Sequence, residues 1–309
     1  MVVLERAGVA GGRTRSERRS RAVAERRSVP LGAGLKRSLG RPALYVVIAL
    51  WMVCTLGPYV VMAVTSVTPQ DQLIAYGMSR LPTHFSVQGY SELFATTPFV
   101  HYMVNSAITA LGTVLFSLVV ASAAAISLSR FRFRGRTTVL TALLVAQLFP
   151  AVLLVIPLST MLRSGHLLNS RAGLVLIYVT FATPFATYLL KGFLDGLPKE
   201  LDEAATVDGC SPMQMVRHIL VPLLRPGLTA AGTYIFIFAW NEFLYALTFT
   251  SSTASQTIPV GLQLFIGDYQ IRWDLLTAGG VIAAVPVLVG FMLVQKQLIG
   301  GLAAGAVKG

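Results

Sequence analysis

The polar stretch EAATVDGCSPMQMVRHILVP, residues 203 to 222, decides the fold because apolar segments long enough to cross a bilayer lie on both sides of it. Just before it, Pro198 suits the first position of a short helix, and the acidic residues between 200 and 203 complement the positive end of its dipole. Gly209 can adopt the left-handed conformation that ends this helix. The run SPMQ, residues 211 to 214, then predicts a capping box that starts a second short helix.

The second helix is expected to run to about Leu220, because Pro222 and then Pro226 and Gly227 interrupt the helical pattern. The stretch is therefore predicted to be a capped helix-turn-helix loop between two membrane spans. By its local chemistry alone it also fits an ordinary amphipathic connector.

The chain around this loop is strongly apolar. Hydrophobic residues make up 54% of the 309 residues, charged residues 12%, and the mean hydropathy is +0.68, which is outside the range of an ordinary soluble domain. Six apolar runs approach or exceed the roughly 20 residues that cross a bilayer. They cover about 43–66, 104–129, 137–162, 172–190, 228–249 and 276–295. The sequence predicts an all-α polytopic membrane protein with six transmembrane helices, whose first span is retained rather than cleaved as a signal.

The basic residues predict the orientation of these spans. One side of the predicted topology carries 21 of the 25 Lys and Arg residues, in the N-terminal tail, the segments 130–136 and 191–227, and the C-terminal end. By the positive-inside rule this side is cytoplasmic, so both termini and the loop at 191–227 are expected inside the cell. Residues 1–42 form a basic tail that is predicted to be disordered, and a membrane domain covers 43–309.

The tail has three interpretations: a solvated topological signal, an anchor for anionic lipid, or an arm for nucleic acid. Nucleic acid is not expected as a partner, because no aromatic residues are interleaved with the basic ones.

Several kinds of site are not expected in this chain. Cys54 and Cys210 lie on different elements and form no disulfide framework. The four histidines have no carboxylate or cysteine partners at ligand spacing, so no metal site is expected; they are His84, His101, His166 and His218. No phosphate-binding loop and no hydrolase or metalloprotease motif occurs in the sequence. We therefore expect a chain that is not an enzyme and holds no cofactor.

The loop resembles the EAA loop of ABC-importer permeases. The likeness rests on Glu203-Ala204-Ala205, Gly209, Ile219 and Pro222 at the spacing of that motif, with Val221 where the family usually has leucine. The segments FIFAWNEF, residues 236 to 243, and GLAAGAVKG, residues 301 to 309, resemble the smaller membrane subunit of maltose-type carbohydrate importers. The resemblance covers about residues 43 to 309.

This resemblance implies the type I ABC-importer permease fold and a function. The chain would be one permease subunit of an importer for a carbohydrate, with a di- or oligosaccharide expected. It would pair with a second homologous permease, an ABC ATPase dimer and an extracytoplasmic sugar-binding protein in the cell membrane. ATP and Mg²⁺ would bind the ATPase partner. The EAA loop, residues 191–227, would dock in a cleft of the ATPase, with a short C-terminal tail, 296–309, reaching the same interface.

The residues expected to couple to the ATPase follow from this likeness. Glu203 would form a charged contact and Gly209 the shaping turn, with the tail contributing more weakly. The full set is Glu203, Ala204, Ala205, Asp208, Gly209, Ile219, Pro222 and Lys308.

A second candidate site is Trp240-Asn241-Glu242 in the fifth apolar run, roughly 20 Å along a helix that starts at Leu228. A charge at that depth costs about 2.5 to 3.5 kcal/mol, so Glu242 is expected to face a protein interior or a wet cavity and to have a partner. These residues are a candidate translocation pathway or gate. An interhelical hydrogen bond or a contact to the partner permease is the alternative.

Prolines inside the predicted spans indicate bent helices around a cavity. They are Pro58, Pro150, Pro157, Pro184 and Pro286. The outer loops at 68–102 and 250–273 are candidate docking surfaces for the binding protein, or an interfacial aromatic belt.

Three alternatives of function stay open at this point. An ion- or proton-coupled secondary carrier would use Glu242 as its protonatable group, although no internal repeat between the two halves supports it. An ABC permease for a non-sugar solute would carry the same EAA loop. An intramembrane enzyme lacks any paired nucleophile and base.

Overall fold

The computed structural model describes residues 32–77, 82–267 and 270–306. The chain divides into two units, residues 1–60 and 61–309. Helix α2 (Gly32–Ser66) begins ahead of the first predicted span, and its segment Leu44–Ser66 is long and apolar enough to cross a membrane. Residues 32–42 of the basic tail belong to α2, so the disorder predicted for 1–42 is not found there; for residues 1–31, which lie outside the described part of the chain, it stays a prediction.

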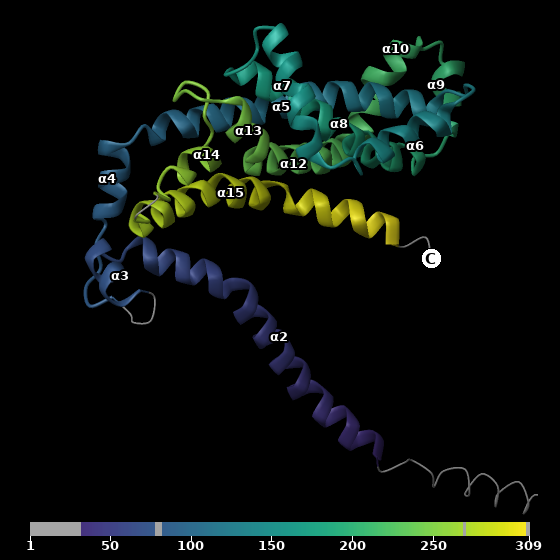
Figure 1. Cartoon of the computed structure of the whole chain (residues 1–309). Coiled ribbons are helices and arrows are strands. Elements are labelled where there is room, and N and C mark those ends of the chain that lie inside the picture. The colour runs from purple at the N-terminus through teal and green to yellow at the C-terminus, as the bar shows by residue number, and fades with distance from the viewer. Residues whose placement is uncertain (1–31, 78–81, 268–269, 307–309) are drawn as a thin grey trace, which may run out of the picture. The chain divides into compact units, whose positions relative to one another are not determined.

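The second unit is built from helices (Figure 1). Within the described ranges no residue belongs to a β-strand, and the one isolated bridge joins Ile266 to Ile271. In chain order the helical elements are α3 (Gln70–Tyr76), α4 (Gln88–Thr96), α5 (Phe99–Arg130), α6 (Arg136–Ala146), the 3-10 segment η2 (Ala151–Leu154), α7 (Val155–Ser164), α8 (Arg171–Asp195), α9 (Glu200–Val207), α10 (Pro212–Met215), the π segment η3 (Val216–Leu220), α11 (Val221–Leu223), α12 (Arg225–Asn241), α13 (Leu244–Phe249), α14 (Ile258–Gln263) and α15 (Trp273–Ala306).

The predicted all-α membrane fold is confirmed. Four helical segments are long and apolar enough to span a bilayer: Leu44–Ser66, Phe99–Arg130, Arg171–Asp195 and Trp273–Met292. Two bent helix pairs pass the same test together, which gives six spans if each pair counts as one.

The third and fifth spans are not the continuous helices that the apolar runs suggest. In the third, Arg136–Ala146 and Ala151–Ser164 meet at 94° with Pro150 between them in an extended conformation. Proline has no N–H to donate and disfavours helical backbone before it, which explains the break. Pro184 by contrast stays inside the continuous helix α8. The expected bending is therefore found at one of these two prolines.

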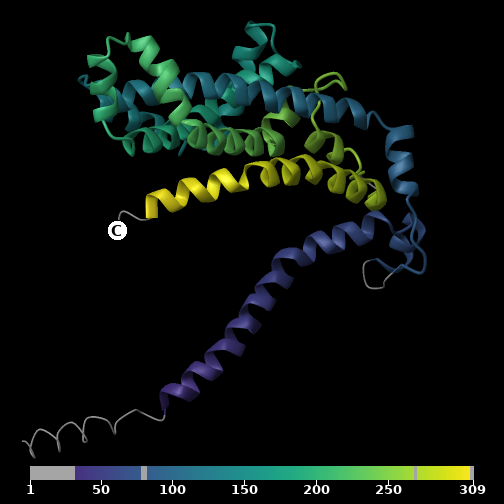
Figure 2. The ribbon, with the colours of Figure 1, turned by 180° about the vertical axis from the view of Figure 1, so that it is seen from behind.

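Helices α5, α8 and α12 pack side by side, and α15 lies along α12 (Figures 1 and 2). Close packing is possible because Ser117, Ala121 and Ala125 of α5 are fully buried at a spacing of four residues, on one face of the helix.

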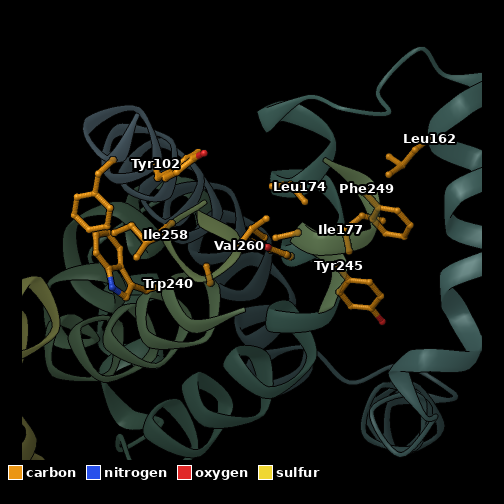
Figure 3. Packing of buried hydrophobic residues seen from close by; sticks show 14 of the residues in the cluster. Tyr102, Leu162, Leu174, Ile177, Trp240, Tyr245, Phe249, Ile258 and Val260 are labelled. Atoms are coloured by element: carbon orange, nitrogen blue, oxygen red, sulfur yellow. The ribbon is translucent and has the colours of Figure 1, made fainter. Parts of the chain in front are cut away.

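A buried apolar cluster draws side chains from α4, α5, α7, α8, α12, α13, α14 and α15, and Figure 3 labels several of them. Gly261 of α14 lies against Tyr102 of α5, and a Cβ added to this glycine would stand 2.2 Å from the ring. Only glycine allows this approach.

A second cluster joins α5, α8 and α12 to the EAA loop. Leu220 and Leu224 of the loop are buried beside Leu190 and Leu194 of α8. The loop helices α9 and α10 lie at the end of α5 that is opposite α4 (Figures 1 and 2). The bundle thus fixes one side of the loop.

The C-terminal segment expected as a short tail, 296–309, is helical where the structure describes it. Its backbone continues helix α15 as far as Ala306. Lys308, a weaker coupling candidate, lies outside the described residues.

Candidate functional site

The EAA loop forms two short helical segments around a glycine turn. Helix α9 has the acidic residues Glu200, Asp202 and Glu203 in its first turn. The sequence suggested Pro198 as the first residue of this helix, which is wrong. The helix begins at Glu200, with Lys199 as its cap. The acidic residues then lie nearer the positive end of the helix dipole than a start at Pro198 would place them.

The predicted turn and capping box are both present. Gly209 has a φ of +77°, in the left-handed region, and the Cys210 N–H donates to the Ala205 carbonyl 3.0 Å away. The Ser211 hydroxyl accepts from the Gln214 N–H, and the Ser211 N–H donates to Gln214 Oε1 at 2.8 Å. These contacts fix the direction in which the second segment leaves the turn.

The second segment continues beyond the predicted end at Leu220. It passes through the π segment η3, in which the Val221 N–H donates to the carbonyl of Val216, and it stays helical to Leu223. Pro222 lacks an N–H, so the ladder of hydrogen bonds cannot run through it unchanged, and a wider turn before it accommodates this loss. The loop then meets α12 at an angle of 72°.

The two sides of the loop differ sharply in exposure. Ala205 is buried, and Ile219 and Pro222 are half-buried, so these three expected coupling residues are at least partly covered by the rest of the chain. The exposed members of the set are Glu203, Ala204, Asp208 and Gly209.

The exposed side of the loop also carries two apolar side chains that sequence reasoning missed. Val207 is 87% exposed and Met213 is 74% exposed, one on each side of the glycine turn. Their apolar character at the ends of two polar helices was the available signal. Exposed apolar groups among charged ones are typical of a surface that binds another protein. We refer to Glu203, Val207, Asp208 and Met213 as the exposed loop face.

The capping box gives a modest prediction. Ser211→Ala should destabilise the loop by about 1 kcal/mol, which lowers the ratio of its ordered to its frayed form by a factor of about five. Amide hydrogen exchange of residues 211–215 should accelerate accordingly. Ser211→Asp keeps a capping oxygen and should exchange like the wild type. Equal exchange in the alanine variant would show that tertiary packing alone holds this segment.

The fifth span breaks at Glu242. Helix α12 ends at Asn241, Glu242 is extended with a ψ of 127°, and α13 begins two residues later. The Glu242 carboxylate accepts a hydrogen bond from the Tyr178 hydroxyl at 2.6 Å and from the N–H groups of Tyr245 and Ala246 at 2.9 and 3.1 Å.

Glu242 therefore has the partner that its depth in the membrane demands. The carboxylate satisfies two N–H groups at the start of α13, which would otherwise be buried without acceptors, and it ties this helix to α8 through Tyr178. Glu242 thus has a structural role: it caps the start of α13 and links that helix to α8.

The two residues before Glu242 make separate contacts. Trp240 is buried, and its indole N–H donates to the Ala283 carbonyl of α15 at 3.0 Å. The Asn241 side chain is exposed and donates to the Ile237 carbonyl one turn earlier in its own helix. The three residues thus do not converge on one point.

A separate apolar groove of about 290 Å³ runs between α5, α12 and α15. Val114, Thr229, Thr233, Phe236 and Pro286 contribute to its walls. Trp240, Asn241 and Glu242 do not line it, so the groove and the capped break are distinct features of α12.

At the end of the bundle opposite the EAA loop, a charged cluster joins the segment before α15 to α4. The guanidinium of Arg272 contacts Asp274 at 2.9 Å and Glu92 at 2.8 Å. The hydrogen bond to Asp274, followed by that to Glu92, raises the pKa of Arg272 further above its usual value. Gln70 donates to the Ile271 carbonyl and so adds the start of α3 to this cluster. The ion pair between Arg272 and Glu92 therefore joins the two outer segments named as candidate docking surfaces.

Residues 114–299, more than half of the chain, match the family model described as binding-protein-dependent transport system inner membrane component. The chain belongs to this family. The matched region begins within α5 and ends within α15, so it contains both the EAA loop and the break at Glu242.

Curated relatives match across nearly the whole chain. The sulfoquinovosyl glycerol transport system permease protein SmoH of Agrobacterium fabrum is 32% identical, with 87% of this chain and 95% of SmoH covered. The diacetylchitobiose uptake system permease protein DasC of Streptomyces coelicolor is 34% identical, with 89% and 100% covered. The chain is thus an inner-membrane transport permease by family.

A solved structure shows the same fold. A bacterial ABC transporter involved in the import of the acidic polysaccharide alginate has a chain that aligns with a TM-score of 0.72 and 20% identity, covering 94% of this chain and 100% of that chain. The expected fold of an ABC-importer permease is confirmed.

Proposed function

We propose that this chain is a permease subunit of an ATP-binding-cassette importer for a carbohydrate, with a di- or oligosaccharide as its class of solute. The chain lines half of the translocation pathway and is not itself catalytic. The names of its relatives, which refer to sulfoquinovosyl glycerol and diacetylchitobiose, support a carbohydrate over a peptide, an amino acid or phosphate.

The observation that carries the coupling role is the exposed loop face. A loop that only joined two spans would have no need of a buried anchor of leucines on one side and exposed apolar and acidic side chains on the other. In the proposed importer this face docks in a cleft of an ATPase subunit, with Glu203 in a charged contact and Val207 and Met213 in apolar contacts. Closure of the ATPase dimer on ATP and Mg²⁺ then moves the loop and, through it, α8 and α12.

The other partners follow from the same proposal. A second, homologous permease completes the pathway, and an extracytoplasmic sugar-binding protein delivers the solute to the outer segments 68–102 and 250–273. The family description, which names a binding-protein-dependent system, supports the last of these. ATP and Mg²⁺ bind the ATPase partner, and we assign no cofactor to this chain.

The decisive experiment is to purify the membrane complex through a tag on this chain and to identify the proteins that accompany it. Two permeases, an ATPase and a binding protein are expected. Calorimetric titration of that binding protein with a panel of sugars then names the solute. A binding protein that takes amino acids or phosphate and no sugar would contradict the carbohydrate assignment.

Topology gives a further prediction: both termini and the EAA loop are cytoplasmic. In a variant without Cys54 and Cys210, single cysteines are introduced at exposed positions on each side. Thr206→Cys and Thr137→Cys should be protected from an impermeant thiol reagent in intact cells, while Ala95→Cys and Ala254→Cys should react. All four should react in permeabilised cells, which controls for local accessibility. The reverse pattern would show that the positive-inside argument is wrong for this chain.

A further inference from the structure

One buried ion pair connects the EAA loop to a membrane span. Arg130 is the last residue of α5, and Asp202 lies in the first turn of α9, next to Glu203. The Arg130 Nε and Asp202 Oδ2 atoms are 3.0 Å apart, and the two side chains are 4% and 20% exposed. Helix α5 packs along α8 and α12, so Arg130 stands at the end of the helix that contacts both other helices of the bundle.

No other ion pair among the described residues joins α9 to a span. The other ion pairs are Lys191 with Asp195, within α8, and Arg272 with Glu92 and Asp274 at the opposite end of the bundle. Every hydrogen bond that the side chains of α9 and α10 make stays inside the loop. The Ser129 hydroxyl of α5 donates to Asp195 at the end of α8, but Arg130 with Asp202 is the polar contact between a span and α9 among the described residues.

The attachment is a contact at a single point. Although Nε faces Oδ2 at ion-pair distance, the angle is not that of a hydrogen bond, and the buried Nη1 and Nη2 have no acceptor within the described part of the chain. Oδ1 of Asp202 is also buried without a donor. An arginine and a carboxylate can form two parallel hydrogen bonds, and this pair forms neither.

Two physical consequences follow from this geometry. Each charge is buried and depends on the other, so the pair resists separation. A contact at one point, with unused donors and an unused acceptor beside it, still permits α9 to turn relative to α5 and to gain hydrogen bonds as it turns. Strong attachment with freedom to rotate is what a moving loop needs in order to displace a helix.

We propose that Arg130 is a positioning residue that transmits the movement of the EAA loop into α5 through Asp202. This inference rests on the proposed coupling of the loop to an ATPase. It adds a second route, through α5, to the direct continuation of the loop into α8 and α12.

The test uses the complex purified as above, reconstituted in liposomes with its own ATPase and binding protein, and measures sugar uptake and ATP hydrolysis on the same samples. Asp202→Asn keeps the shape of the side chain and removes its charge. We expect uptake per ATP hydrolysed to fall about fivefold, with ATP hydrolysis largely retained. The reversed pair, Arg130→Asp with Asp202→Arg, should regain at least half of the wild-type ratio.

A matched control lies next to Arg130 in α5. Ser129→Ala removes the hydrogen bond from the Ser129 hydroxyl to Asp195 at the end of α8, a contact in which α9 takes no part. It should leave uptake per ATP within twofold of wild type. A second variant, Arg130→Met with Asp202→Leu, removes both buried charges and should insert normally, yet it should show the same fall in ratio as Asp202→Asn.

The outcomes separate this inference from the proposed function. If Asp202→Asn lowers uptake and hydrolysis in parallel, or if the Met and Leu variant couples like wild type, the pair only stabilises the fold and the inference is wrong. If changes at Glu203 and Gly209 also leave uptake untouched, the EAA loop is not the coupling element and the proposed function fails as well.

Discussion

Gly209→Val is expected to lower uptake by more than tenfold while the protein still inserts in the membrane. Gly209 has a φ of +77°, and beyond its two chain neighbours no residue lies within 4 Å of the position that a Cβ would take. The cost is therefore one of backbone conformation alone: about 1 to 2 kcal/mol for a residue with a Cβ in this region, and more for a β-branched one. The chain escapes this strain by changing φ, which turns α10 away from α9 and disrupts the exposed loop face.

The measurement is sugar uptake with stimulation of ATP hydrolysis by the binding protein, normalised to the amount of complex. Gly209→Asn is the matched control, because asparagine tolerates positive φ and the site is open; it should keep most of the uptake. Glu203→Ala tests the same surface without changing the backbone. If Gly209→Val keeps as much uptake as Gly209→Asn, and Glu203→Ala also leaves uptake unchanged, the loop is only a connector.

Glu242→Ala is expected to reduce the amount of folded protein and, with it, uptake by more than tenfold. The change leaves the Tyr178 hydroxyl and the N–H groups of Tyr245 and Ala246 without their acceptor. All three residues are almost completely buried, and a buried donor without an acceptor costs about 1 to 3 kcal/mol. Thermal unfolding of the detergent-purified complex should show the loss directly. Asn241→Ala is the neighbouring control, since that exposed side chain donates its hydrogen bond to Ile237 of its own helix, and it should differ little from wild type.

Glu242→Gln separates the ATP-driven importer from a proton-coupled carrier. An amide oxygen can take the place of Oε2 and keep the bonds from Tyr178 and Ala246, while the amide nitrogen loses the bond from Tyr245. We therefore expect moderate destabilisation and substantial remaining uptake, which resists a protonophore while ATP is maintained. A carrier that titrates Glu242 would lose accumulation altogether. Wild-type uptake that collapses with the proton gradient at constant ATP would overturn the assignment.

The local features of the EAA loop could be predicted because each depends on residues within a few positions of one another. The capping box joins Ser211 to Gln214, three residues apart, and the positive φ of Gly209 follows from the steric freedom of glycine at a helix end. The six apolar runs likewise record a requirement of the bilayer, which acts on each span separately.

The paths of individual spans depended on their surroundings. Pro150 separates two helices that meet at 94°, whereas Pro184 lies inside an unbroken helix. Both prolines remove one backbone donor, and whether the helix continues depends on how neighbouring groups compensate. For the same reason Pro222 ends no helix but follows a π segment. The apolar pattern contains none of this information.

The sequence by itself determined the number of apolar spans, the turn at Gly209, the cap at Ser211 and the need for a partner at Glu242. Only the tertiary structure decided that this partner is Tyr178, 64 residues away, and that Arg130 holds Asp202. It also decided that Val207 and Met213 are exposed while Ala205 is buried. Helical periodicity depends on residues that are near neighbours in the sequence, and the hydrophobic effect favours burial without specifying a partner. A specific polar pair forms only where packing brings two distant parts of the backbone close together.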